Sequence, residues 1–225
     1  MKPATSRSRA RVALISATPT AIPPAVDGLA ESFPEAEIWN LLDDRLLGDL
    51  EAQGGFTPAL EARMHRLIDH AIEGGADGVL LTCSQYGPLA ASVRAPIPVL
   101  APDEAAFEAI ARSGWSRVLV LASIEGSLVD TLERLPASLR RAGVEIGLEG
   151  ACSRAALEAA KRGDRAGLDS ALLAAAQPYA GRVDAVLLAQ FSLTSAAAAL
   201  AAALAVPIVT GPHTAAESLR RRITS

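Results

Sequence analysis

The sequence has 225 residues, of which 50% are hydrophobic and only 4% aromatic, and its formal net charge is −4. The mean hydropathy of +0.27 indicates a sizeable core built mainly from Ala, Leu and Val. The negative charge and the pI of 5.4 argue against nucleic acid or an anionic membrane as the main partner. The most apolar stretch, residues 193–209, is interrupted by Thr194, Ser195 and Pro207, so no membrane-spanning segment is expected.

The N-terminus and the cysteines suggest a cellular location. Residues 1–10 are polar and basic and lack an apolar segment, which predicts a disordered tail rather than a signal peptide. The two cysteines, Cys83 and Cys152, lack the spacing of a metal site or a disulfide framework. A reduced, cytoplasmic protein is therefore expected.

The first half of the chain predicts strands that alternate with helices. Strands are expected at 12–15, 37–41, 79–81 and 97–100, and helices at 23–33, 57–74, 88–93 and 103–112, with a short helix allowed within 43–55. Pro23 and Pro24 suit the first turn of a helix, where a missing N–H costs nothing. Thr57 and Asp103 are placed to cap the helices that follow them. The alternation is typical of a parallel sheet covered by helices.

The second half repeats the first at an offset of about 107 residues. Residues 117–123 match 11–17, 145–146 match 37–38, 184–190 match 77–83, and 207–209 match 98–100. A period of this size corresponds to a small domain and not to a solenoid repeat. The sequence therefore predicts an α/β fold of two similar parallel-sheet lobes, related by internal duplication and a pseudo-twofold axis. We expect a first lobe at 11–113, a second at 114–225 and an active site in the cleft between them; a crossing of the C-terminal helix between lobes is left open.

A candidate site lies in the stretch from Gly75 to Gly87. The apolar run 79–81 predicts a short buried strand, which delivers Thr82, Cys83 and Ser84 to its carboxyl end. Open α/β sheets place their ligands at such ends. A helix N-terminus lowers thiol pKa values and binds anions, so Cys83 is a candidate thiolate. In the predicted cleft Cys83 would face Gln190, and residues 18–20 would face 124–126.

These features resemble the aspartate/glutamate/hydantoin racemase superfamily, which also contains arylmalonate decarboxylase and maleate isomerase. The resemblance covers residues 12–219 and rests on the duplicated halves and on the cysteine six residues after an aspartate, here Asp77 and Cys83. It implies two cysteines, one per half, that exchange a proton with the substrate α-carbon without a metal or a pyridoxal cofactor. It also implies a small carboxylate, either an amino acid or a dicarboxylate, as substrate, and a homodimer.

Gln190 stands where the resemblance implies the second cysteine. An amide neither gains nor loses a proton at accessible pH, and the neighbouring Ser192 would need an activating base. Cys152 is predicted to lie away from the matching strand end. Three hypotheses stay open: racemase-like proton transfer through Cys83, a single-cysteine decarboxylase or lyase, and a small-molecule binding protein that has lost racemase activity.

The single-cysteine reactions differ in what they require of the thiol. Decarboxylation needs no base, because loss of carbon dioxide leaves an enediolate that one acid then protonates, whereas elimination needs one base. The resemblance implies that arylmalonate decarboxylase keeps its cysteine in the second half, whereas here it lies in the first. A decarboxylase built on Cys83 is therefore expected to give product of the opposite configuration.

The remaining candidate residues follow strand ends in both halves. The substrate-binding residues are expected to be Thr18, Pro19, Thr20, Asn40, Thr82, Ser84, Gln85, Ser123, Gln190, Phe191 and Ser192. Residues 18–20 match the carboxylate-binding loop that the resemblance implies, and hydroxyl and N–H groups near Cys83 suit an oxyanion. Helix capping is the alternative role for these hydroxyls. His213 is expected in the first turn of a helix, and His65 and His70 are expected to face solvent.

Overall fold

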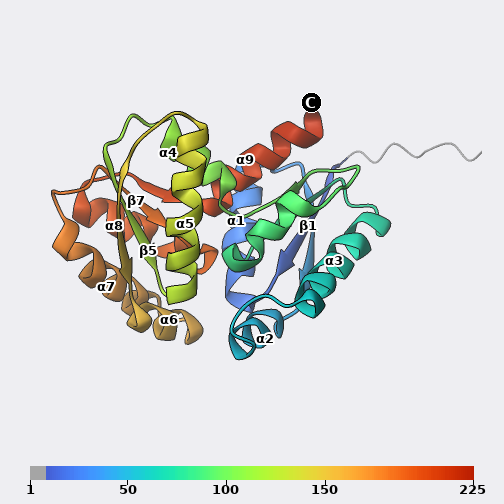
Figure 1. Ribbon diagram of the computed structural model, residues 1–225, viewed down its shortest axis with the longest axis horizontal. Helices are drawn as coiled ribbons and strands as arrows, with labels where there is room; N and C mark the ends of the chain where they lie inside the picture. Colours follow the sequence, from blue (N-terminus) through green and yellow to red (C-terminus); the bar gives the residue numbers. More distant parts are fainter. Residues whose placement is uncertain (1–8) are drawn as a thin grey trace, which may run out of the picture.

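The computed structural model describes residues 9–225, so most of the predicted tail, residues 1–8, lies outside the described part. The described residues form two α/β lobes side by side (Figure 1). Each lobe contains one parallel sheet of four strands, in the order β2-β1-β3-β4 and β6-β5-β7-β8. The shared strand order confirms the predicted α/β fold of two similar lobes. Within residues 9–225, no helix is long and apolar enough to cross a membrane.

The two halves have matching elements. The first contains β1 (Arg11–Ser16), β2 (Glu37–Leu42), β3 (Gly78–Leu81), β4 (Val99–Leu100), α1 (Ile22–Ser32), α2 (Leu46–Ala52), α3 (Pro58–Glu73) and α4 (Glu104–Ala111), with 3₁₀ segments η1 (Pro19–Ala21) and η2 (Ser84–Ser92). The second contains β5 (Arg117–Ala122), β6 (Gly147–Cys152), β7 (Ala185–Leu188), β8 (Ile208–Thr210), α5 (Glu125–Arg141), α6 (Arg154–Lys161), α7 (Arg165–Ala176), α8 (Ala197–Leu204) and α9 (Gly211–Thr224), with η3 (Gln177–Tyr179) and η4 (Phe191–Ala196).

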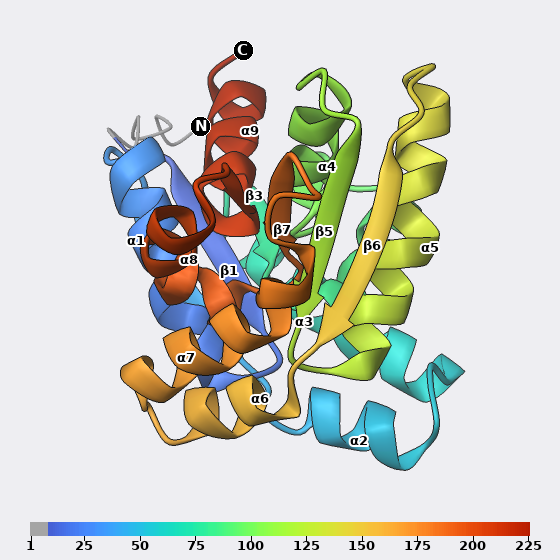
Figure 2. The same ribbon diagram turned by 90° about the vertical axis from the view of Figure 1, so that its left-hand side faces the viewer.

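The last helix of each half packs on the sheet of the other lobe. In α9, Ala216 and Leu219 are buried against Leu14 of the first sheet. In α4, Phe107 and Ile110 are buried in the second lobe with the strands β5 and β7. Figure 2 shows α9 near α1 and β1, and α4 near β5. The predicted boundary at 113/114 separates the two sheets, and α4 and α9 each cross to the other sheet. The sequence left the crossing of α9 open and did not predict that of α4, because an apolar helix face does not reveal which of two similar sheets it covers.

Close packing of α9 depends on a glycine in the central strand β3. A Cβ atom at Gly78 would lie 2.8 Å from Cδ1 of Ile223 and 2.9 Å from Cδ1 of Leu219, both in α9. Gly78 lies opposite Val12 in the register of β1 and β3. The missing side chain thus lets the crossing helix approach the first sheet.

The aspartates of the repeat close the end of each sheet at which its strands begin. The Oδ2 atom of Asp77 accepts a 2.7 Å hydrogen bond from the backbone N–H of Arg11. In the second lobe Oδ2 of Asp184 accepts from the N–H groups of Arg117 and Ser116 at 2.8 and 2.7 Å. These two bonds hold the pKa of Asp184 below its usual value. The aspartate that precedes the cysteine position by six residues is therefore structural.

The two predicted helix caps have different outcomes. The Thr57 hydroxyl accepts a 3.4 Å hydrogen bond from the N–H of Leu60, which confirms it as the cap of α3. The prediction for Asp103 is wrong, because its side chain makes no capping bond to α4 and instead accepts hydrogen bonds from Arg134. A buried guanidinium competes successfully for this carboxylate because the charged pair makes the stronger hydrogen bond.

Candidate active site

A cleft of about 470 Å³ lies between the lobes, where the carboxyl ends of the central strands meet. The first lobe contributes the loop after β1, the helix α2 and the segment after β3; the second contributes the start of α5, the helix α6 and the segment after β7. Most of the predicted site residues line this cleft: Thr18, Pro19, Thr20, Thr82, Cys83, Ser84, Gln85, Gln190, Phe191 and Ser192. The repeat thus brings together residues that are about 107 positions apart.

Cys83 is half-buried and occupies the position before η2, in an extended conformation. Burial raises the pKa of its thiol to about 11, and the nearby carboxylates of Asp130 and Asp103 act in the same direction. Hydrogen bonds from the backbone N–H groups of Tyr86 and Gln85 lower the pKa but do not offset burial. Burial thus raises the pKa of Cys83, whereas a helix N-terminus alone would lower it, and favours the thiol over the thiolate.

Gln190 occupies the matching position before η4 in the second lobe. Its Oε1 atom accepts two hydrogen bonds from Ser123, one from the backbone N–H at 2.7 Å and one from the hydroxyl at 3.1 Å. Since the oxygen is occupied, the Nε2 group is the part of this amide that can donate to a ligand in the cleft. The two equivalent strand ends thus present a thiol and an oriented N–H donor.

Hydroxyl groups around the cleft are available to different degrees. Thr18 and Thr20 hydrogen-bond each other through their Oγ1 atoms at 3.0 Å. Thr82 donates to Ser16 at 2.9 Å and is 3% exposed, so it supports the strand ends. Ser192 makes no side-chain hydrogen bond within the described residues. The hydroxyls best placed to meet a ligand are therefore those of the loop after β1 and of Ser192.

Comparison with known proteins gives structural matches but no sequence family. No protein-family model matches the sequence, and no curated protein matches it significantly. The structure of Picrophilus torridus aspartate racemase matches with a TM-score of 0.77 and 14% identity, covering 96% of this chain and 94% of that one. Glutamate racemase from Thermus thermophilus, in complex with β-chloro-D-alanine, matches with a TM-score of 0.70 and 16% identity, over 96% and 81% of the two chains. This chain has the racemase fold.

A further match within the racemase fold is a mutant arylmalonate decarboxylase with an associated sulfate ion. Its TM-score is 0.56 and its identity 20%, and the alignment covers 96% of this chain and 94% of that one. The structural matches confirm the resemblance to the aspartate/glutamate racemase superfamily at the level of the fold. At these identities they leave the reaction and the substrate to be argued from the site itself.

Some residues singled out in the sequence lie outside the cleft of this racemase fold. Asn40 is exposed on β2, the edge strand of the first sheet, and the structure does not bring it to the cleft. Ser123 is only 2% exposed and lies behind Gln190, which it orients. His213 lies in the first turn of α9 and pairs with Glu31 at 2.8 Å.

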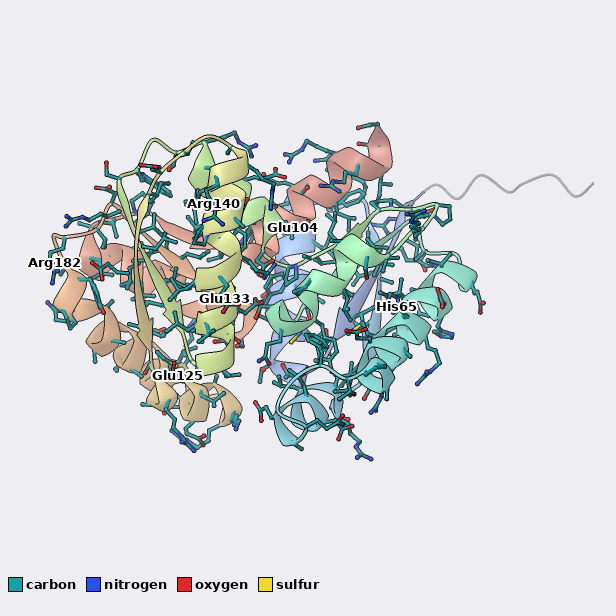
Figure 3. The ribbon with its side chains drawn as sticks, in the orientation of Figure 1. His65, Glu104, Glu125, Glu133, Arg140 and Arg182 are labelled. Carbon is teal, nitrogen blue, oxygen red and sulfur yellow. The ribbon has the colours of Figure 1, made fainter. Side chains whose placement is uncertain are left out.

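Cys152 and the two histidines of α3 do not line the cleft either. Cys152 ends β6 and does not line the cleft. Burial and the neighbouring Glu125 raise the pKa of its thiol, and Figure 3 shows Glu125 at the start of α5. His70 is exposed on α3, whereas His65 on the same helix is half-buried (Figure 3).

Two helices that were not predicted from the sequence as part of the site, α2 and α6, also border the cleft. Asp44, Leu47 and Glu51 line it from α2 and the residues before it, and Leu157 and Lys161 line it from α6. The two helices follow the matching strands β2 and β6, so the repeat itself was the signal that could have identified them. Apart from Lys2, Lys161 is the single lysine of the sequence.

Proposed function

We propose that this chain is a cofactor-independent enzyme of the aspartate/glutamate racemase superfamily, which transfers one proton at the α-carbon of a small carboxylate through Cys83. The observation that carries the proposal is the pairing of a thiol with an oriented amide at equivalent strand ends. A thiol can give or take a proton, whereas an amide can only hydrogen-bond. Proton transfer is therefore confined to the Cys83 face of the substrate, which disfavours two-thiol racemisation.

The protonation state of the thiol favours decarboxylation among the one-thiol reactions. With a pKa of about 11, Cys83 is protonated near pH 7, so it can donate a proton and little thiolate is present to act as a base. In decarboxylation the bond between the α-carbon and one carboxylate breaks, carbon dioxide leaves, and the electron pair stays as an enediolate. Cys83 then gives its proton to the α-carbon, and the thiolate takes a proton from water. Racemisation and elimination would both begin with the thiolate.

Hydrogen-bond donors that already line the cleft would stabilise the enediolate. The Nε2 group of Gln190 is oriented by Ser123, and the hydroxyls of Thr18, Thr20 and Ser192 line the same cleft. Donors held ready for developing negative charge commonly supply the largest catalytic term. The loop after β1 is the proposed site of the carboxylate that the product retains.

Decarboxylation through Cys83 requires a substrate whose α-carbon carries two carboxylates. Within the described residues, the charged groups of the lining are Asp44, Glu51 and Lys161, all exposed on α2 and α6 or beside them. Lys161 is the one cation among these groups, so it is the charged group of the lining that attracts a carboxylate. We propose an α-substituted malonate as the substrate class. For the protein itself we propose the homodimer that the resemblance implies and the cytoplasmic location that the sequence predicts.

Proton NMR in deuterium oxide tests this function with the wild type and Cys83→Ala. The panel contains amino acids, dicarboxylates and α-substituted malonates. We expect malonate consumption with one deuteron in the product, abolished in C83A, and chiral analysis of an α-methylated substrate tests the predicted hand. Exchange of an amino acid's α-proton with inversion would establish a racemase instead, and binding without any turnover would establish a binding protein.

A further inference from the structure

The segment that carries Cys83 packs across the lobe boundary on α5 (Figure 1). At the start of α5, the side-chain amide of Gln85 covers Gly126, where an added Cβ would lie 2.6 Å from Nε2. Two turns further along, the guanidinium of Arg134 lies against Gly87 of the same segment, 3.6 Å from the place of a Cβ atom. The position of Cys83 is thus set from the second lobe as well as the first.

Arg134 is the centre of a partly buried ion network beside this segment. It donates to Oδ1 of Asp103 at 3.0 Å, makes a second contact to Oδ2 of the same carboxylate, and donates to Oδ2 of Asp130 at 2.9 Å. Its guanidinium also lies 5.3 Å from the centre of the Phe107 ring. The side chains of Arg134 and Asp103 are only 22% and 10% exposed. Such a pair is weakly screened by solvent, so its charges act on their surroundings.

The network contains two carboxylates and one guanidinium, and Asp103 lines a small cavity together with Thr82 and Ser84, the two neighbours of Cys83 in the chain. Both Asp130 and Asp103 raise the pKa of Cys83, though less than burial does. The other titratable groups around the thiol are Tyr86 on its own segment and the charged residues at the cleft mouth, which are Asp44, Glu51 and Lys161. Arg134 is the cation that compensates the two carboxylates of this network.

We propose that Arg134 is a positioning residue for Cys83: it holds the cysteine segment against α5 and balances the charge of Asp103 and Asp130, and it thereby sets how readily the thiol gives up its proton. The proposal rests on the proposed function in taking Cys83 as the proton donor. The charge balance itself is a property of the folded protein and can be measured without a substrate.

The test is the rate of alkylation of Cys83 by iodoacetamide at pH 8 to 9. The measurement uses a Cys152→Ser background, so that Cys83 is the thiol that reacts. Arg134→Gln is expected to slow alkylation about tenfold, as a rise of one pKa unit would. Asp130→Asn is expected to accelerate it several-fold, because a negative charge near the thiol is lost. Arg134→Lys keeps the charge and is expected to restore most of the wild-type rate.

The opposite effects of Arg134→Gln and Asp130→Asn on the alkylation rate distinguish this role from a purely structural one. Loosening of the segment would expose the thiol and accelerate alkylation in both Arg134→Gln and Asp130→Asn, so changes in the same direction, or none, overturn the proposal. Arg63→Gln is the matched control, because Arg63 bridges Asp43 and Asp49 at 2.6 and 2.8 Å in the first lobe and should leave the rate unchanged. Shifted alkylation without turnover of any substrate would refute the proposed function and leave the role of Arg134 standing.

Discussion

The amide of Gln190 is held by two hydrogen bonds from Ser123, through the backbone N–H and through the hydroxyl. Both bonds end on the oxygen, so the orientation of the amide follows from contacts outside the cleft. The sequence predicted that Gln190 would stand opposite Cys83, because the repeat aligns the two strand ends. It did not predict which end of the amide faces the ligand, since that depends on the fold bringing Ser123 beside it.

Gln190→Cys is expected to change the reaction more than the fold. Loss of the oriented donor should lower decarboxylation about a hundredfold, while a second thiol on the opposite face should allow α-proton exchange with inversion of the product acid. Deuterium incorporation and chiral chromatography measure both effects. Gln190→Ser loses the same donor without gaining a thiol, so equal inversion in that control would contradict the one-thiol assignment.

At the scale of elements, the positions of the strands were predicted closely, but the surfaces against which the helices pack were not predicted. Residues 12–15 and 37–41 fall within β1 and β2, because apolar runs between turn residues are local signals. The predicted strand 97–100 shortens to β4, because Pro98 has no N–H for the ladder and only its carbonyl pairs, with Val79 at 2.9 Å. The crossing of α4 and the place of α2 beside the cleft depend on long-range packing, which periodicity does not encode.

The crossing helix α9 gives a prediction for Gly78. Gly78→Val is expected to lower the free energy of unfolding by about 1–3 kcal/mol, because its side chain would overlap Leu219 and Ile223. Urea denaturation measures this change. Gly48→Ala is the comparison, since a Cβ at Gly48 meets nothing within 4 Å and should be neutral or slightly stabilising in a helix. Equal effects of the two substitutions would show that α9 does not pack as described.

Asp103 gives a prediction for the connection between β4 and α4. Burial raises the pKa of its carboxyl from 3.8 to about 6, despite Arg134. A raised folded-state pKa means that its contribution to stability is present below pH 3.8 and is lost as the pH rises through 6. The difference in unfolding free energy between wild type and Asp103→Asn should therefore fall by up to about 3 kcal/mol from low pH to pH 7. A difference that rises with pH would show that the ion pair outweighs burial.

For the whole molecule, the exchange of α4 and α9 ties the lobes together at their cores, far more strongly than the contacts at the cleft. Each crossing helix buries apolar residues in the opposite lobe, and this burial is the larger stabilising term. The cleft edge is joined by polar and close contacts of η2 with α5, including the Ser84 and Ser127 hydroxyls at 3.5 Å. Changes at the cleft edge should therefore affect ligand binding more than global stability.

A substitution at Gly126 tests whether the cleft edge affects ligand binding more than global stability. Gly126→Val places a side chain where the amide of Gln85 now lies, 2.6 Å from the added Cβ, so the Gln85 side chain must turn away from α5. Because the crossing helices are untouched and the Gln85 amide leaves its present place in the cleft lining, we expect KM for the carboxylate to rise a few-fold with little change in Tm. In the double variant Gly126→Val with Gln85→Ala the overlap is removed, so its KM should equal that of Gln85→Ala alone. A large fall in Tm for Gly126→Val alone would instead show that the η2 contact with α5 carries the stability of the inter-lobe junction.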